Sequence, residues 1–258
     1  GILVSSVLSA FVPASVYQRF PRGVFGVPVA ALAGMAIPAC ECASVPVGQS
    51  LMRRGVAPSH ALVFLLASPA INPVATAVAF NGNPMMVWAR FAASLAAACV
   101  VGWIWMRVRF TIDGVADDAC GHHHHRSWEA FRITAVQDFL QACGFLVIGA
   151  AIAALIKVAV PESALSVVTG NVWLGVAMMV LLAVVMSLCS EADAFVAASF
   201  VGVSPIAQLV FMVVGPMVDI KLVFMQAGAF GWRFVLRFVP LVLVAAMLSA
   251  VGVGIALL

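Results

Sequence analysis

Two short polar stretches interrupt a very apolar sequence and carry its reactive side chains. The first, IPACECASVPVG at residues 37–48, places two cysteines on either side of Glu41. The second, SLCSEADA at residues 187–194, holds one cysteine and two acids. Cysteine sulfur binds soft metals and metalloids, and a carboxylate in apolar surroundings is a candidate for proton exchange. The two stretches therefore predict thiol ligation, proton exchange or both, on elements that must bring them together.

The composition defines the class of protein in which this chemistry occurs. Of the 258 residues, 64% are hydrophobic and only 9% are charged, which is typical of an integral membrane protein. Long apolar runs without short-range alternation favour helices over an outer-membrane barrel. The net charge of +3 suggests contact with lipid headgroups and not with nucleic acid. The sequence has no phosphate-binding Gly-x4-Gly-Lys-Ser/Thr motif, so it predicts no ATP hydrolysis by that route, and we expect no enzyme and no cofactor.

We predict an all-α polytopic membrane protein with about eight transmembrane helices. A span needs about 20 residues to cross about 30 Å of hydrocarbon. The candidate spans are Gly1–Tyr17, Val24–Ala39, Ala57–Phe80, Met85–Met106, Thr134–Ala159, Val172–Leu188, Ser204–Phe230 and Phe234–Leu258. Gly1 is not a methionine, and we expect the first helix to be incomplete at its N-terminus.

The sequence repeats itself at a shift of 147 residues. GVAP at residues 55–58 overlays GVSP at residues 202–205, and Cys42 falls on Cys189. We therefore predict two homologous repeats, residues 1–106 and 134–258, joined by a polar loop at residues 107–133.

Four helix interruptions form two equivalent pairs under this shift. They lie at residues 38–46, 68–73, 187–193 and 215–219. Ordinary proline kinks explain a single break, but a matched set is typical of transporters whose broken helices meet around a solute. The breaks are therefore predicted to converge in one cavity at the repeat interface.

Four acids lie in or beside apolar stretches, where an ionised side chain at mid-bilayer costs about 2.5 kcal/mol or more. They are Glu41, Glu191, Asp193 and Asp219. Asp219 has a possible ion-pair partner in Lys221, whereas the other three acids have no nearby cation in sequence, although Arg53 and Arg54 could reach them in space. Cys40, Cys42 and Cys189 are candidate soft ligands, although small residues that ease helix packing are an alternative.

The polar loop carries a second, weaker candidate for metal binding. It holds Cys120 and four consecutive histidines, His122, His123, His124 and His125. Imidazole and thiolate bind borderline metals, but a solvated loop explains the same residues without a metal. Its four arginines favour a cytoplasmic location, although Arg19, Arg22, Arg233 and Arg237 could belong to the opposite face.

Two long stretches of the sequence resemble a known family. IPACECASVPVGQSLMRRGVAPSHALVFLLASPAINP and SLCSEADAFVAASFVGVSPIAQLVFMVVGPMVDIK are similar to the two signature blocks of the ArsP-like predicted permeases. The resemblance implies a permease, and the best-known members of the family export trivalent organoarsenicals. The family's motif residues fall on Pro38, Cys40, Cys42, Pro46, Ser68, Pro69, Asn72, Pro73, Cys189, Glu191, Asp193, Pro216 and Asp219. Glu41 makes the first site more anionic.

The sequence thus predicts a multi-pass permease of the cell membrane with a small solute or metalloid as its substrate. The motif residues from Cys40 onward, together with Glu41, form the expected substrate site. Two alternatives stay open: a membrane thiol–disulfide carrier that uses Cys42 and Cys189, and a non-transporting subunit that recruits a soluble partner. A homo-oligomer or an accessory subunit is a possible assembly.

Overall fold

The structure, a computed structural model, describes residues 23–36, 41–53, 55–70, 73–108, 136, 147, 172–188, 192–200 and 202–258. Within these ranges every regular element is a helix, as the sequence predicts. The side chains of residues 36, 41–43, 73 and 74 are not described.

The first group of helices precedes the polar loop. Its members are α3 (Gly26–Ala36), α4 (Glu41–Arg53), α5 (Pro58–Ala70), α6 (Pro73–Ala79) and α7 (Pro84–Val108). Helix α5 packs against α3, α4 and α7 and is buried on all sides, which suits its largely apolar sequence. Its backbone approaches α3 closely, since a Cβ added to Gly34 would lie 2.9 Å from the carbonyl oxygen of Phe64.

The second group of helices follows the loop. Its members are α9 (Val172–Met186), α10 (Ala192–Ser199), α11 (Pro205–Val214), α12 (Ile220–Phe230) and α13 (Trp232–Leu257). Helix α11 packs against α9, α10 and α13, and most of its residues are buried. Ser204 starts α11 by accepting a hydrogen bond from the backbone N–H of Ala207 at 3.2 Å, a usual N-terminal cap.

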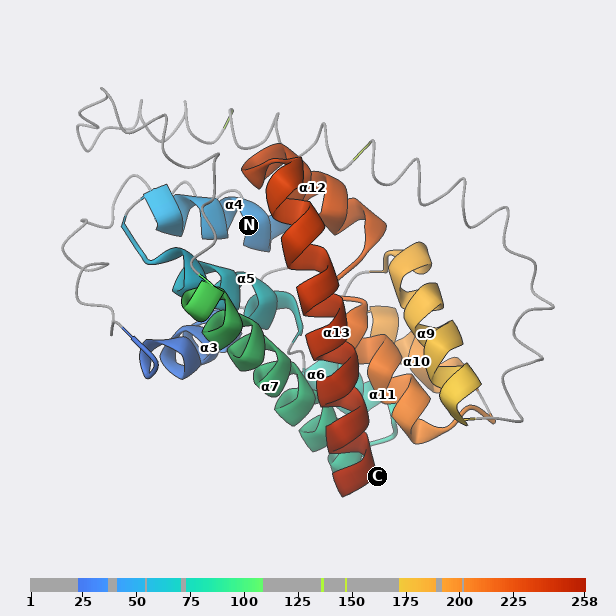
Figure 1. Cartoon of the computed structure of the whole chain (residues 1–258). Helices are drawn as coiled ribbons and strands as arrows, with labels where there is room; N and C mark the ends of the chain where they lie inside the picture. Colours follow the sequence, from blue (N-terminus) through green and yellow to red (C-terminus); the bar gives the residue numbers. More distant parts are fainter. Residues whose placement is uncertain are drawn as a thin grey trace.

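Helices α7 and α13 pack along each other in opposite directions at the centre of the molecule (Figure 1). The aromatic ring of Trp105, near the end of α7, contacts Phe234 and Phe238, near the start of α13. At the other end of α13, Gly254 lies against Ile206 at the start of α11. The end of α7 and the start of α13 therefore lie at one end of the bundle, and the end of α13 and the start of α11 lie at the other end.

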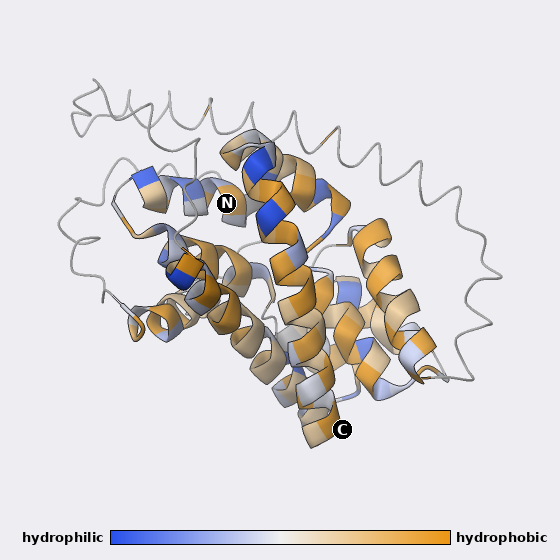
Figure 2. Cartoon of the chain, in the orientation of Figure 1, coloured by the Kyte–Doolittle hydropathy of each residue, from blue (hydrophilic) through white to orange (hydrophobic). Residues whose placement is uncertain are grey.

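Three stretches of the described chain are long and apolar enough to cross a membrane by length and composition: Pro58–Ala79, Pro84–Val108 and Trp232–Leu257. Large apolar side chains such as Trp173, Leu236 and Leu248 are exposed on the outside, where lipid would cover them. Figure 2 shows that most positions along the helices are hydrophobic, and that hydrophilic positions include some near the start of α13 and the end of α4. The predicted count of eight spans stays a prediction.

The helices next to the two cysteine motifs are short. Helix α4 has 13 residues and α10 has 8, so at about 1.5 Å per residue neither reaches across about 30 Å of hydrocarbon. Helix α4 packs on α5 and α12, and α10 packs on α6 and α11. The described helices α4 and α10 therefore pack on the bundle and are by themselves too short to cross it.

Candidate functional site

Six of the predicted site residues have described side chains, and all six are buried: Pro46, Ser68, Pro69, Asp193, Pro216 and Asp219. Glu41, Cys42 and Pro73 belong to helices whose course is described, but their side chains are not. The remaining predicted residues lie outside the described residues: Cys40, Asn72, Cys189, Glu191, and the loop residues Cys120, His122, His123, His124 and His125. Within the described ranges no group of three or more metal-binding side chains occurs.

A buried arginine is the ion-pair partner of Asp193. Arg90 Nη2, on α7, lies 2.9 Å from Asp193 Oδ2, on α10, and both side chains are 2% exposed. The sequence shows no nearby cation for Asp193 and left Arg53 and Arg54 as possible partners in space, whereas the structure pairs Asp193 with Arg90. The pair links α7 to α10, and its two residues are 103 positions apart in the sequence.

Neutral acceptors on the first group of helices hold the same guanidinium. Arg90 Nη1 donates to the hydroxyl of Thr76 on α6 at 2.9 Å, and Arg90 Nε donates to the carbonyl of Ala70 at 3.3 Å. Ala70 is the last residue of α5, where carbonyls lack partners within the helix and the helix dipole attracts cations. Arg90 therefore caps the C-terminal end of α5, at the break predicted for residues 68–73.

The carboxylate of Asp193 is only half satisfied. Its Oδ2 accepts the hydrogen bond from Arg90, whereas its buried Oδ1 has no hydrogen-bond partner among the described residues. A buried acceptor without a donor is unfavourable, and such groups in native structures usually have a functional explanation or an unseen partner. Asp193 thus offers one open acceptor beside a fixed positive charge.

Asp219 has a different role at the break of residues 215–219, between α11 and α12. Its Oδ1 accepts a 2.5 Å hydrogen bond from the backbone N–H of Leu222 and so caps α12. Lys221 Nζ lies 3.5 Å from Asp219 Oδ2, which confirms the ion pair expected from the sequence. This acid is therefore fixed by its own helix.

The contact between α4 and α12 is polar but includes no described ion pair between the two helices. Gln49 Nε2, on α4, donates to the carbonyl of Ala229, on α12, at 3.2 Å. Ser44 and Ser50 of α4 and Gln226 of α12 are also buried. The Oε1 atom of Gln226 has no hydrogen-bond partner among the described residues.

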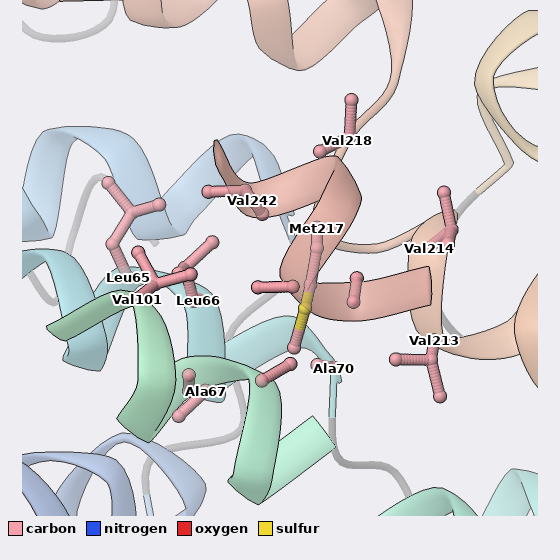
Figure 3. Close-up of a cluster of buried hydrophobic side chains, with 14 of the residues drawn as sticks. Leu65, Leu66, Ala67, Ala70, Val101, Val213, Val214, Met217, Val218 and Val242 are labelled. Atoms are coloured by element: carbon pink, nitrogen blue, oxygen red, sulfur yellow. The ribbon is translucent and has the colours of Figure 1, made fainter. Parts of the chain in front are cut away.

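Apolar side chains fill the space between the end of α5 and the segment that joins α11 to α12. Met217, between α11 and α12, is 1% exposed and extends toward Ala67 and Ala70 at the end of α5 (Figure 3). Leu66 of α5 and Val213 of α11 belong to the same buried cluster. The described parts of the two breaks therefore meet around a closed, apolar contact.

Sequence reasoning missed Arg90, although a signal was available. Arg90 is the seventh residue of the long apolar helix α7, and an arginine at such a position needs a counter-ion within the protein. The four acids in or beside apolar stretches were the available candidates for that counter-ion. The 103-residue separation hid the answer from any local pattern.

Comparison with known proteins agrees with the resemblance seen in the sequence. The model of the predicted permease family ArsP_1 matches residues 1–255. The chain is 34% identical over 257 residues to the UPF0718 protein YcgR of Bacillus subtilis, which covers 95% of this chain and 87% of that protein. It is 31% identical over 258 residues to a Streptococcus mutans protein named as a subunit of a two-component membrane permease complex, which covers 92% and 85%. No solved structure matches the chain. The chain belongs to the ArsP_1 family of predicted permeases.

Proposed function

We propose that the protein is a multi-pass permease of the cell membrane that moves a small solute between two inverted repeats. The positions of the helices support the repeats. Helix α5 begins at Pro58 and α11 at Pro205, 147 residues later, and the same shift separates the start of α6 at Pro73 from the start of α12 at Ile220. Gly55 and Gly202, related by this shift, both adopt a left-handed conformation before these helices, with φ values of +88° and +90°.

The packing of the helices also repeats, and this observation carries the proposal. The contacts of α5 with α3, α4 and α7 have counterparts in the contacts of α11 with α9, α10 and α13. Two contacts join the groups in the same reciprocal way: α10 packs on α6, and α4 packs on α12. Such a pattern is expected from a pseudo-two-fold axis that passes between α7 and α13.

The opposite directions of α7 and α13 support an inverted relation between the two proposed repeats. These helices are equivalent under the 147-residue shift. By the same relation, the stretch α5–α6 and its counterpart α11–α12 are expected to run in opposite directions. Inverted repeats with broken helices at their interface are a common plan of secondary transporters, with the solute site near the middle of the membrane. The Arg90–Asp193 pair and the Asp219 cap both lie at breaks of this kind.

Basic residues indicate which end of the bundle faces the cytoplasm. Arg107 at the end of α7 and Arg233 and Arg237 near the start of α13 belong to the same end, because the aromatic contacts of Trp105 join those two helix termini. The sequence left open whether these arginines lie on opposite faces. The described turns at the other end, residues 80–84 and 199–206, contain no charged side chain. By the positive-inside rule, the end where α13 begins faces the cytoplasm.

For the solute, we propose a soft, thiophilic metalloid or metal species, moved outward. The resemblance to organoarsenical exporters supports this choice, as does the pair of equivalent cysteines, Cys42 and Cys189. With Cys40, they would supply sulfur ligands to such a solute. Glu41, Asn72 and Glu191 stay proposed site residues on the strength of the sequence alone.

Flux in everted membrane vesicles tests this function. Trivalent metalloids, soft metal ions and a hard cation are offered to the wild type and to the Cys42→Ser and Cys189→Ser variants. We expect each serine to reduce flux of the soft solute by about tenfold or more and to leave any hard-cation flux unchanged, because oxygen is a poor ligand for soft ions. Cys99→Ser is the matched control, since Cys99 is a buried residue of α7 away from the motifs. Full flux in both motif variants would refute the thiol site.

The same variants separate transport from electron transfer. A thiol–disulfide carrier would form a reducible bond between Cys42 and Cys189 during its cycle, which thiol trapping of the wild type would detect. Solute flux without that disulfide supports the permease, and a disulfide without flux supports the carrier.

A second candidate function is that of one subunit in a larger permease. The name of the Streptococcus mutans relative favours it. Purification of the tagged chain from its own membranes, with its chromosomal neighbours intact, would reveal a stoichiometric second chain if the permease has two components. Flux by the purified chain alone in liposomes would exclude an obligate partner.

A further inference from the structure

We propose that Gln226 on α12 binds the solute, by accepting a hydrogen bond from a hydroxyl or N–H group that the solute carries. This inference rests on the proposed permease function. It adds a site residue outside both cysteine motifs and names the hydrogen-bonding character of the solute. It also assigns the contact between α4 and α12 to the route of the solute.

The amide of Gln226 has an open acceptor in a buried place. The residue is 2% exposed, and its Oε1 atom has no hydrogen-bond partner among the described residues. Burial of such an acceptor is unfavourable, whereas an apolar side chain of similar size would carry no such penalty. A solute that donates a hydrogen bond to Oε1 removes the penalty while it is bound. The open acceptor therefore favours binding of a donor-bearing solute.

The corresponding contact in the other half of the fold shows that packing at this position does not require an amide. The shift of 147 residues relates Gln226 to Ala79 of α6, and it relates Gln49 of α4 to Val196 of α10. Helix α10 packs on α6 as α4 packs on α12, with these apolar residues in place of the two glutamines. The glutamines are thus specific to the α4/α12 contact, which points to a role beyond holding the helices together.

The contact between α4 and α12 is one that a polar solute can enter. Gln49 Nε2 donates to the carbonyl of Ala229 at 3.2 Å. Hydrogen bonds between helices in a membrane contribute little to stability, because the separated groups find other partners. Ser44 and Ser50 are further buried polar residues of α4. Separation of α4 from α12 therefore exchanges weak polar contacts for contacts with water or solute, and it uncovers the acceptor of Gln226.

Gln226 also lies on the proposed route of an exported solute. It follows Asp219, the cap of α12 at the break of residues 215–219, by seven residues, which is about 10 Å along the helix axis. Seven residues make two turns, so both positions lie on the same side of α12. Beyond Gln226, α12 ends close to Trp232, at the end of the bundle that we assign to the cytoplasm. An outgoing solute would therefore reach Gln226 before it reaches the break.

The experiment measures binding of two probes to the purified full chain in detergent by calorimetry. Phenylarsenous acid carries As–OH donors, whereas its adduct with ethane-1,2-dithiol keeps the arsenic and the ring but has no O–H or N–H group. Both probes are offered to the wild type and to the Gln226→Leu, Gln226→Met and Gln208→Leu variants. Gln208 is the matched control, since its amide, on α11, donates to the carbonyl of Phe200 at 3.0 Å, away from the α4/α12 contact.

We expect the wild type to bind the acid more tightly than the adduct. Gln226→Leu should reduce this preference by at least about tenfold, because the site then lacks the acceptor for the donor of the acid. Gln208→Leu should keep the wild-type preference. Gln226→Met, which keeps the length of the side chain, should behave as Gln226→Leu does and decides the question if that variant does not fold.

A parallel unfolding titration separates solute binding from a structural role. If Gln226 binds the solute, its replacement by leucine weakens binding while the stability of the empty protein stays the same or rises. A structural amide would instead lose stability on replacement and leave the preference for the acid unchanged.

Three results would overturn the inference: no preference for the acid in the wild type, an undiminished preference in Gln226→Leu, or an equal loss in Gln208→Leu. Flux of the acid in vesicles from the same strains distinguishes this failure from a failure of the proposed function. Equal flux in the wild type and in Gln226→Leu would leave the permease intact and refute only the role of Gln226. Absence of flux in the wild type would count against the proposed function itself.

Discussion

The contact of α10 with α6 and the contact of α4 with α12 occupy matching positions but use different chemistry. The first contains a buried ion pair, Arg90–Asp193, supported by Thr76. The second is joined by an amide-to-carbonyl hydrogen bond from Gln49 to Ala229, and no ion pair between its helices is described. The two contacts thus hold the helices beside the cysteine motifs in different ways. Among the described residues, the first contact joins opposite charges across two helices, whereas the second joins an amide and a backbone carbonyl across them.

The largest effect is expected when one charge is removed from the first contact. Arg90→Gln leaves Asp193 buried without a counter-ion, which should lower the free energy of unfolding by about 3–5 kcal/mol. Unfolding in mixed micelles by titration with a denaturing detergent measures it. Arg237→Gln, on the exposed side of α13, should change stability by no more than about 0.5 kcal/mol. If the two substitutions have equal effects, the charged contact has no special weight.

A smaller effect is expected from the acid on the other side of the comparison. Asp219→Ala removes the cap of α12 and should cost about 0.5–2 kcal/mol, measured in the same titration. Asp219→Asn keeps a side-chain oxygen for the backbone N–H of Leu222 and should retain most of the stability. A loss from Asn as large as that from Ala would show that the charge next to Lys221, and not the cap, is what matters.

The smallest effect, and the one of opposite sign, is expected at Gln226. Its buried Oε1 has no hydrogen-bond partner among the described residues, so Gln226→Leu removes an unsatisfied acceptor at similar volume. We expect a change between zero and about 1 kcal/mol of stabilisation in the same unfolding titration. Gln49→Leu is the control, because it breaks the bond to Ala229 and should destabilise by about 1 kcal/mol or more. A loss in Gln226→Leu as large as that in Gln49→Leu would mean that the amide of Gln226 has a partner in the membrane.

The order of the helices was readable from the sequence because it depends on local signals. The predicted spans began at Ala57 and Ser204, one residue before α5 and α11 begin, and the break around Pro216 separates α11 from α12 as expected. The Asp219–Lys221 pair was within reach for the same reason, since the two residues are neighbours. The partner of Asp193 was not, because it depends on how α7 and α10 meet in space. The closed apolar contact around Met217 was equally hidden, since hydropathy marks a residue as buried without naming its neighbours.

The inverted arrangement of the two halves is the central claim, and the sidedness of two equivalent turns tests it directly. Asn81 lies in the exposed turn between α6 and α7, and Trp232 lies at the start of α13 beside the equivalent turn. Single variants Asn81→Cys and Trp232→Cys are treated in intact cells with a membrane-impermeant maleimide, and labelling of the unsubstituted protein is subtracted. We predict that Asn81→Cys is labelled in intact cells and Trp232→Cys only after the membrane is opened. Labelling of both positions from the same side would contradict the inverted repeats and the solute route between them.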